Sequence, residues 1–246
     1  MTSALKRVLR KLGFIVIRTS NANARYVTGP QLSPFDEALF RTFPTLHGLT
    51  FIQVGANDGL RFDPLRRHIA AFGWRGVLVE PDPRYFVELQ ANYRGIPGLQ
   101  FLNAAVDTKR GERTLYTIDA DMSLLPEWAR GVGSLDRSHV AAVTERLGLP
   151  ATTIAAHRVR AVQWEDVLQT AGADAPDIIV LDTEGHDAAL IQALDFTRHA
   201  PHVLHFEHSH CSRAERLQTY DRLMAHGYDF VSADHDTTAY RIRPRA

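Results

Sequence analysis

The sequence predicts an α/β fold in which a mostly parallel sheet carries helices on both faces. From Thr50 onward, short apolar runs alternate with helix-length segments, the pattern of right-handed β-α-β units. The last two runs, 228–233 and 238–242, stand close together around His235 and Asp236, which is typical of a hairpin. We therefore expect one antiparallel strand at the C-terminal edge of the sheet.

The composition is that of a chain with enough apolar residues for one core. Of its 246 residues, 45% are hydrophobic and 23% are charged, as in ordinary globular domains. Lys and Arg total 28, as do Asp and Glu. The chain thus lacks the basic excess of proteins that bind nucleic-acid phosphates, and we expect no nucleic-acid partner. Cys211 is the only cysteine, which excludes an internal disulfide and favours a reducing, cytoplasmic location. No apolar run reaches the roughly 20 residues that span a bilayer.

Residues 1–45 are expected to form a basic arm and linker in front of one domain over 46–246. Six basic residues precede the first acid, Asp36. Apolar residues at helical spacing predict a short amphipathic helix over 3–12, and the composition of 19–34 predicts a linker. A basic helix of this kind either attaches weakly to an anionic membrane surface or packs on the domain, and the sequence leaves both open.

The first three strands are predicted where apolar runs stop at turn residues. Gly-Ala-Asn-Asp-Gly ends the first and Pro-Asp-Pro the second, and a helical pattern follows each of them. The expected elements are, in order, a strand over 51–57, a helix up to about 72, a strand over 76–80, a helix over about 84–93 and a strand over 99–106.

Two further buried strands follow a long irregular segment. Residues 114–118 alternate and predict a short extra strand, whereas the segment from about 119 to 160 fits the alternation poorly. We expect that segment to be an insertion over the ligand edge of the sheet. The later elements are a strand over 178–182, a helix over about 188–194, a strand over 203–207 and a helix over 213–225.

A glycine loop and a carboxylate mark the edge at which such sheets bind ligands. Gly55 removes a side chain where the backbone must approach a ligand, and Gly59 permits a tight turn into a helix. The N–H groups at that helix start favour a carboxylate or a phosphate. Glu80 ends the second strand, where a carboxylate accepts hydrogen bonds from both hydroxyls of a ribose. The pair predicts an adenosine-containing ligand.

The spacing within this loop narrows the choice of ligand. Asn57 occupies the place of the middle glycine of a dinucleotide fingerprint. A P-loop is excluded because the chain contains no Gly-Lys pair. The polar residues Asn57 and Asp58 inside a G-x-x-x-G loop suit a ligand with an amino acid tail, such as S-adenosylmethionine.

Several motifs, in order and at suitable spacing, resemble the FkbM-type methyltransferases. The motifs are Phe51-Ile-Gln-Val-Gly-Ala-Asn-Asp-Gly59, Val79-Glu-Pro-Asp-Pro83, Asn103-Ala-Ala-Val106, Gly133-Ser-Leu-Asp-Arg137, Leu181-Asp-Thr-Glu-Gly-His-Asp187 and Phe206-Glu-His208. The resemblance covers roughly residues 48–243 and implies a class I methyltransferase (Rossmann-like) fold. It further implies S-adenosylmethionine-dependent O-methylation of a hydroxyl on a carbohydrate or a natural-product-like small molecule.

The resemblance also implies roles for residues around the cofactor. The loop would hold the amino acid end, Glu80 the ribose, and the third strand end the adenine. The implied cofactor-binding residues are Gln53, Gly55, Ala56, Asn57, Asp58, Gly59, Glu80, Pro81, Ala105, Val106, Asp107 and Asp182.

The catalytic candidates follow the fourth strand. An alcohol acceptor must lose its proton, and a general base within hydrogen-bond reach assists that loss. Glu184 or His186 is expected to be this base, with Asp182 orienting the cofactor's ammonium or the acceptor. The alternative for His186 is a local hydrogen bond at a helix start, and the family usually has Tyr or Ala at this position.

The acceptor pocket is expected between the insertion and the fifth strand. Its candidates are Trp128, Ser134, Glu207 and His208, and Trp128 either stacks on a sugar or aromatic acceptor or packs in the fold.

Histidines 199–210 suggest a metal, but strand alternation separates His205 and Glu207 from His202, His208 and His210. No metal is therefore predicted. The weaker candidates for a divalent cation are Asp182, Glu184, Asp187 and Glu207.

Two other functions remain open on the sequence. An NAD-dependent oxidoreductase would need close backbone approach to pyrophosphate at Asn57, which its side chain hinders. A catalytically silent nucleotide- or partner-binding module would have no use for the Asp182 and Glu184 pair.

Overall fold

The computed structural model describes residues 33–121 and 123–241. The helix expected over 3–12, most of the linker expected over 19–34 and the C-terminal residues 242–246 lie outside the described residues. In the part of the chain that is described, no helix is long and apolar enough to cross a membrane.

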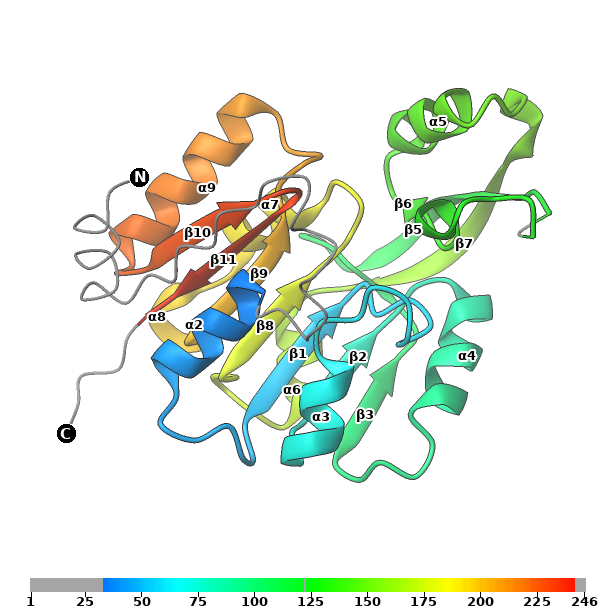
Figure 1. The fold of residues 1–246 in the computed structure, drawn as a ribbon. Coiled ribbons are helices and arrows are strands. Elements are labelled where there is room, and N and C mark those ends of the chain that lie inside the picture. The colour runs from blue at the N-terminus through cyan, green and yellow to red at the C-terminus, as the bar shows by residue number, and fades with distance from the viewer. Residues whose placement is uncertain (1–32, 122, 242–246) are drawn as a thin grey trace, which may run out of the picture. The chain divides into compact units, whose positions relative to one another are not determined.

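The main sheet has seven strands in the order β10-β11-β9-β8-β1-β2-β3 (Figure 1). Five of them are parallel neighbours: β1 (Thr50–Val54), β2 (Arg75–Val79), β3 (Leu99–Leu102), β8 (Ile178–Leu181) and β9 (Val203–Glu207). The hairpin adds β10 (Asp229–Ala233) and β11 (Asp236–Tyr240). Strand β11 is antiparallel to both of its neighbours and lies one place in from the edge, with β10 outermost. The predicted α/β fold class is confirmed.

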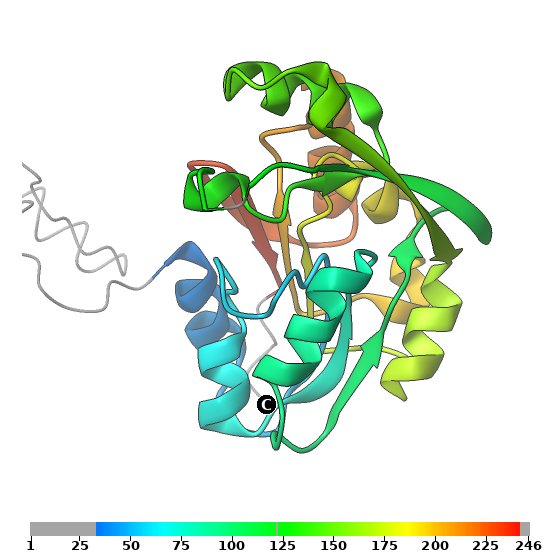
Figure 2. The same cartoon turned by 90° about the vertical axis from the view of Figure 1, so that its right-hand side faces the viewer.

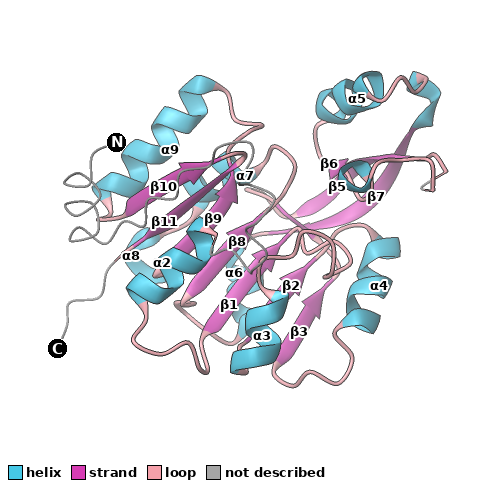
Figure 3. Ribbon diagram, viewed as in Figure 1, coloured by secondary structure: helices cyan, strands magenta, loops and turns pink. Residues whose placement is uncertain are grey.

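The central strands form where the apolar runs are, because both faces of the sheet are covered. All four residues of β8 and the last four of β1 are buried. Alternate side chains enter opposite cores: Ile52 and Val54 join one cluster, whereas Phe51 joins the other. Helices α6 (Trp164–Ala171), α7 (Asp187–Ala193), α8 (Phe196–His199) and α9 (Arg213–Ala225) contribute to the first cluster. Helices α2 (Pro34–Thr42), α3 (Arg66–Phe72) and α4 (Pro83–Asn92) contribute to the second (Figure 3).

Helix α2 lies in the segment that we expected to be a linker. Ser33 and Asp36 form a capping box at its start, and Pro34 occupies the first turn, where it is favourable. The side chains of Phe35 and Leu39 are buried against the sheet. The helix has only nine residues, so its amphipathic pattern is too short for composition alone to indicate it.

The third strand, expected to be continuous over 99–106, is broken at Asn103. The Asn103 amide donates hydrogen bonds to the main-chain oxygens of Glu80 and Pro81 at 2.7 and 3.2 Å. The chain leaves the main sheet there, and β4 (Ala105–Val106) pairs instead with β7 (Ile154–Val162).

The insertion is larger than the expected 119–160 and forms a sheet of its own. Strands β4, β7, β5 (Gly111–Ile118) and β6 (Gly133–Ser134) form it in that order. It also holds helix α5 (Arg137–Arg146) and two 3-10 turns, η2 (Glu127–Ala129) and η3 (Ala151–Thr153). Figures 1 and 2 show this second sheet and α5 beyond the carboxyl ends of the parallel strands, where the insertion was expected.

Candidate active site

A cavity of about 1020 Å³ opens at the carboxyl ends of the parallel strands. Strand ends β1, β2, β8 and β9 supply Gly55, Glu80, Asp182 and Glu207 to its wall, and the insertion supplies Trp128 and its neighbours. Small-molecule sites typically measure about 300–1,000 Å³, so the cavity is at the upper end of that range.

Gly55 is required by the approach of a neighbouring strand end. Its φ is +81°, and a Cβ added there would lie 1.8 Å from the main-chain oxygen of Asp182. The N–H groups of Gly55 and Ala56 both donate to the Val79 oxygen, at 2.9 and 3.0 Å. The loop is therefore fixed between β8 and β2 with its edge facing the cavity.

Glu80 joins two loops through its carboxylate. One oxygen accepts the Asn57 N–H and the other the Asp82 N–H, each at 2.8 Å. Burial raises the pKa of Glu80 to about 7, against the opposing effect of these two hydrogen bonds. The side chain is only 7% exposed, and it lines the cavity.

Asn57 connects the first loop to the insertion. Its backbone is left-handed, with φ of 48°, and its side-chain oxygen accepts the Asp58 N–H at 2.8 Å. A Cβ on Gly131 would lie 2.1 Å from the Asn57 amide nitrogen, so the insertion packs directly on this side chain.

Most of the predicted cofactor-binding residues line the one cavity. They are Gln53, Gly55, Ala56, Asn57, Glu80, Pro81, Ala105, Val106 and Asp182. Asp58, Gly59 and Asp107 are not among its lining residues.

These three residues have structural partners instead. The Asp58 carboxylate accepts the Leu60 and Arg61 N–H groups, each at 2.9 Å, and a Cβ on Gly59 would meet the Tyr93 ring at 2.5 Å. Asp107 is paired with Arg113 and His186.

Asp182 lies among carboxylates at the floor of the cavity. Burial by the surrounding protein and the charges of Glu184, Asp187 and Glu207 raise the pKa of Asp182. The side chain is nevertheless exposed to the cavity. Asp187 is buried, accepts the N–H groups of Thr183 and Glu207 at 2.9 Å each, and ties the loop after β8 to β9. It does not line the cavity.

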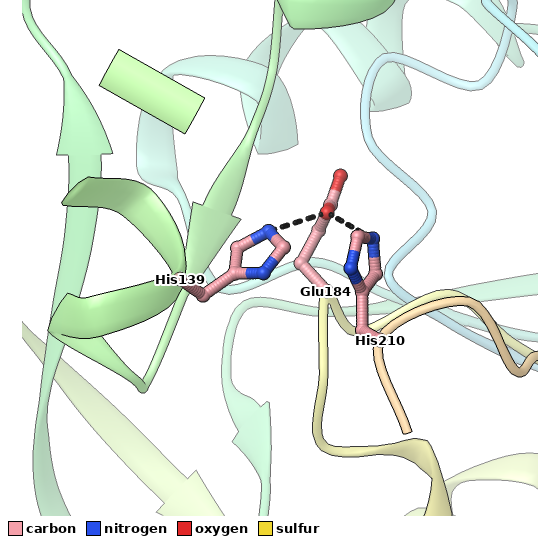
Figure 4. Close-up of side chains that lie close together, drawn as sticks. All are labelled: His139, Glu184 and His210. Atoms are coloured by element: carbon pink, nitrogen blue, oxygen red, sulfur yellow. Dashed lines mark hydrogen bonds and ion pairs between the residues drawn. The ribbon is translucent and has the colours of Figure 1, made fainter. Parts of the chain in front are cut away.

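Glu184 is held in an unusual conformation that directs its carboxylate toward two imidazoles (Figure 4). Its φ is +53°, a left-handed value that is uncommon outside glycine. The Ser134 hydroxyl donates to its main-chain oxygen at 2.7 Å. His139 Nε2 and His210 Nε2 lie 2.9 and 3.4 Å from the same oxygen, Oε2. Burial raises the pKa of Glu184, but the bonds from these histidines outweigh burial and lower it to about 2.

His210 also contacts a second carboxylate. Its Nε2 lies 3.1 Å from Glu207 Oε1. The bonds to Glu184 and Glu207 raise the pKa of His210 to about 10.

His186 lines the cavity separately from this group, with Nε2 3.1 Å from the Asp107 carboxylate. It is therefore not only a local helix-start residue.

The predicted acceptor residues divide into two pairs. Trp128 and Glu207 line the cavity, and the Arg146 guanidinium lies 4.7 Å from the centre of the Trp128 ring. Ser134 and His208 are buried and are not among the lining residues. Ser134 supports Glu184, and His208 Nδ1 lies 3.0 Å from the Thr237 hydroxyl.

Sequence reasoning did not find His139. It lies 45 residues from Glu184 in the chain, on helix α5 of the segment that was expected only to be an insertion. No spacing rule connects the two. Among the described residues, the donor atoms that come together at one point are those of His139, Glu184 and His210, rather than the four carboxylates considered for a cation.

The strand order and the insertion define a class I methyltransferase fold. Residues 53–230 match the family model of the methyltransferase FkbM domain. This match spans more than half of the chain, which therefore belongs to the FkbM methyltransferase family. A search of curated proteins gave no match.

Solved methyltransferase structures are similar to this chain at low sequence identity. A precorrin-6y C5,15-methyltransferase from Geobacter metallireducens GS-15 is 13% identical, with a TM-score of 0.43 over 89% of this chain and 95% of that one. The FkbM methyltransferase from Methylobacillus flagellatus KT is 13% identical, with a TM-score of 0.48 over 78% of this chain and 43% of that one. Fibrillarin from Aeropyrum pernix, solved with bound S-adenosyl-L-methionine, is 11% identical, with a TM-score of 0.39 over 83% of this chain and 72% of that one.

Proposed function

We propose that this chain is an S-adenosylmethionine-dependent O-methyltransferase that acts on a hydroxyl of a carbohydrate or natural-product-like small molecule. One observation carries the proposal: residues from four strand ends that suit the two ends of an adenosine ligand and a hydroxyl acceptor line a single cavity. Family membership supplies the class of reaction.

The cofactor is proposed to lie between β1, β2 and the start of the insertion. Glu80 would accept hydrogen bonds from the ribose hydroxyls, and Ala105 and Val106 would flank the adenine. Gln53 supports the fit, because its buried side-chain oxygen lines the cavity and has no hydrogen-bond partner among the described residues. A buried acceptor without a donor is costly, and the cofactor's ammonium could supply the donor.

The residues after β8 are proposed to handle the acceptor. The bound cofactor supplies an activated methyl group on a sulfonium, so most of the protein's contribution is to hold the acceptor oxygen in line. Asp182 at the cavity floor would orient the acceptor or the ammonium. Glu184 or His186 would receive the hydroxyl proton. The Asp107 carboxylate orients the His186 ring, an arrangement that suits an imidazole base.

Thermal stabilisation tests the cofactor directly. A ligand at 100 times its dissociation constant adds about 2.7 kcal/mol of stability, so S-adenosylmethionine and S-adenosylhomocysteine should each raise the melting temperature, and NAD should not. A shift with NAD alone would identify an oxidoreductase instead. No shift with any of the three ligands would identify a silent module.

A methyl-transfer assay tests the proposed class of acceptor. The enzyme is incubated with methyl-labelled S-adenosylmethionine and, in parallel, with glycans, small phenols and polyols, and RNA. We expect label on a glycan or small-molecule oxygen, lost in Glu184→Gln or in His186→Gln according to which residue is the base. Label on RNA alone would contradict the proposed acceptor class while leaving the cofactor assignment intact.

A further inference from the structure

The convergence of two histidines on Glu184 is not explained by cofactor binding or by the choice of base. We propose that His139, Glu184 and His210 bind one divalent transition-metal ion, such as Zn²⁺ or Mn²⁺, at the wall of the cavity. Imidazole nitrogens and carboxylate oxygens are the ligands that such ions take in proteins.

The donor atoms already lie at suitable separations. Metal bonds of about 2.0–2.1 Å in a tetrahedral site place neighbouring ligand atoms roughly 3.3 Å apart. The Glu184 oxygen lies 2.9 and 3.4 Å from the two Nε2 atoms, and Glu207 Oε1 lies 3.1 Å from His210 Nε2. No two atoms of the His139, Glu184 and His210 set are more than 4.8 Å apart, a spread that small side-chain rotations can close.

Three separate segments hold these side chains in place. His139 comes from α5 of the insertion, Glu184 from the loop after β8, and His210 from the loop after β9 (Figure 4). Glu184 keeps its left-handed backbone and its bond from Ser134, and backbone strain of this kind concentrates at functional sites. Metal sites assembled from distant segments need such fixed ligands.

Hydrogen bonding alone satisfies this arrangement poorly. Both imidazoles point Nε2 at one oxygen of Glu184, and His210 Nε2 divides its contact between Glu184 and Glu207. One N–H that is shared between two acceptors makes two bent hydrogen bonds, each weaker than a linear one. A cation between the donor atoms of His139, Glu184 and His210 would be bonded by these three side chains at once.

The surrounding charge also favours a cation. Glu184 and Glu207 line the same cavity as two further carboxylates, Asp182 and Asp236. In the part of the chain that the structure describes, neither Glu184 nor Glu207 forms an ion pair with lysine or arginine, and their charged partners are histidines.

The location suggests what the ion would do, and this step rests on the proposed function. Glu184, Glu207 and His210 line the cavity in which the acceptor is placed. A metal there would select acceptors that can ligate it, such as a vicinal diol or a catechol-like pair of hydroxyls.

Metal binding is tested on the full chain without any substrate. After treatment with a chelator and its removal, Zn²⁺ and Mn²⁺ are titrated separately by calorimetry, and Co²⁺ is followed by its visible spectrum. We expect one ion per chain and a Co²⁺ spectrum typical of nitrogen and oxygen ligation. Glu184→Gln, His139→Ala and His210→Ala should each weaken binding at least tenfold, whereas His47→Ala, which removes an exposed histidine on the other side of the fold, should not.

Two outcomes would overturn the proposal. One is the absence of saturable binding of all three ions to a chain that still gains stability from S-adenosylmethionine, which would leave an ion-paired network at Glu184. The other is binding of the same strength in Glu184→Gln and in the His139→Ala/His210→Ala double variant. Circular dichroism and the cofactor-induced melting shift show whether each variant is folded, so a failure of this proposal is distinct from a failure of the proposed function.

Discussion

Glu80 has a structural role in the fold in addition to the binding role proposed for it. It is buried, yet it carries a carboxylate whose two oxygens each already accept one main-chain N–H. Each oxygen has a further lone pair, which leaves it able to accept a ribose hydroxyl. The sequence predicted its position because it ends a buried strand at the correct distance from a glycine loop.

The raised pKa of Glu80 predicts a pH-dependent affinity for the cofactor. Ribose hydroxyls donate to the ionised carboxylate, so affinity should rise as the pH increases from 6 to 8 through the pKa of about 7. Glu80→Gln should bind more weakly and lose this rise. Calorimetric titration of S-adenosylhomocysteine at several pH values measures the affinity of each protein and its dependence on pH. An unchanged pH profile in Glu80→Gln would show that another group is responsible.

The same pKa has the opposite effect on the stability of the ligand-free chain. The folded pKa of about 7 exceeds the usual value of 4.5, so the folded state favours the protonated form. The contribution of Glu80 to the free energy of unfolding is full below pH 4.5 and is lost as the pH rises through 7. In urea unfolding, Glu80→Gln should therefore remove a decline in stability between about pH 5 and 7.

Gly55 and Gly73 offer a matched pair of substitutions. Both have left-handed backbones, with φ of +81° and +64°, but only Gly55 would place a Cβ against another backbone. The conformation alone costs alanine about 1–2 kcal/mol, and overpacking adds about 1–3 kcal/mol. Urea unfolding should therefore show a larger loss for Gly55→Ala than for Gly73→Ala. Equal losses would mean that the Asp182 main chain, at the end of β8, moves at little cost to accommodate the added Cβ.

At the scale of elements, the apolar strands were predictable and the internal structure of the insertion was not. Strands β1, β2, β8 and β9 are buried on both faces, so their composition alone marks them. Strands β4 and β6 have two residues each, too few to show a period of two. The break after β3 depends on the Asn103 amide, which no local pattern reveals.

This difference explains which parts of the candidate site were found. Most of the predicted cofactor residues follow strands with clear boundaries, and nine of the twelve line the cavity. His139 depends on how α5 folds over the sheet, and that placement is set by tertiary contacts rather than by the spacing of residues in the chain.

Ser134 predicts how the insertion supports the site. Ser134→Ala removes the bond to the Glu184 main chain, at a cost of about 1 kcal/mol. We expect kcat to fall about fivefold, which corresponds to that energy, with the dissociation constant for S-adenosylmethionine unchanged.

Steady-state kinetics with a binding titration separates the two effects. Ser138→Ala is the control, because the hydroxyl of Ser138 is exposed and contacts only Asp136. A matching loss of cofactor affinity in Ser134→Ala would instead indicate a general disturbance of the cavity.

At the scale of the whole molecule, helix α2 belongs to the packed unit that begins at Ser33. Phe35 and Leu39 are 2% and 0% exposed, and burying such side chains contributes about 1.5–3 kcal/mol each. The boundary expected at residue 45 would place this helix with the arm, so the two boundaries make different predictions for truncation.

Two truncations distinguish these boundaries. Removal of residues 1–32 leaves every described contact in place, and we expect urea unfolding and the cofactor-induced melting shift to be preserved. Removal of residues 1–42 also deletes α2 and should lower the free energy of unfolding by about 3–6 kcal/mol. If the longer truncation is as stable as the shorter one, α2 contributes little to the core.

The second sheet makes the two parts of the cavity wall structurally independent in the sequence. The proposed cofactor site is built mostly by the ends of β1 and β2, whereas the far wall of the cavity, which includes Trp128 and Val143, belongs to the insertion between β3 and α6. Exchanging that insertion between homologous enzymes should transfer the specificity for the acceptor and leave the methyl donor unchanged. Specificity for new acceptors could thus evolve without changes in the part of the wall proposed to bind the cofactor.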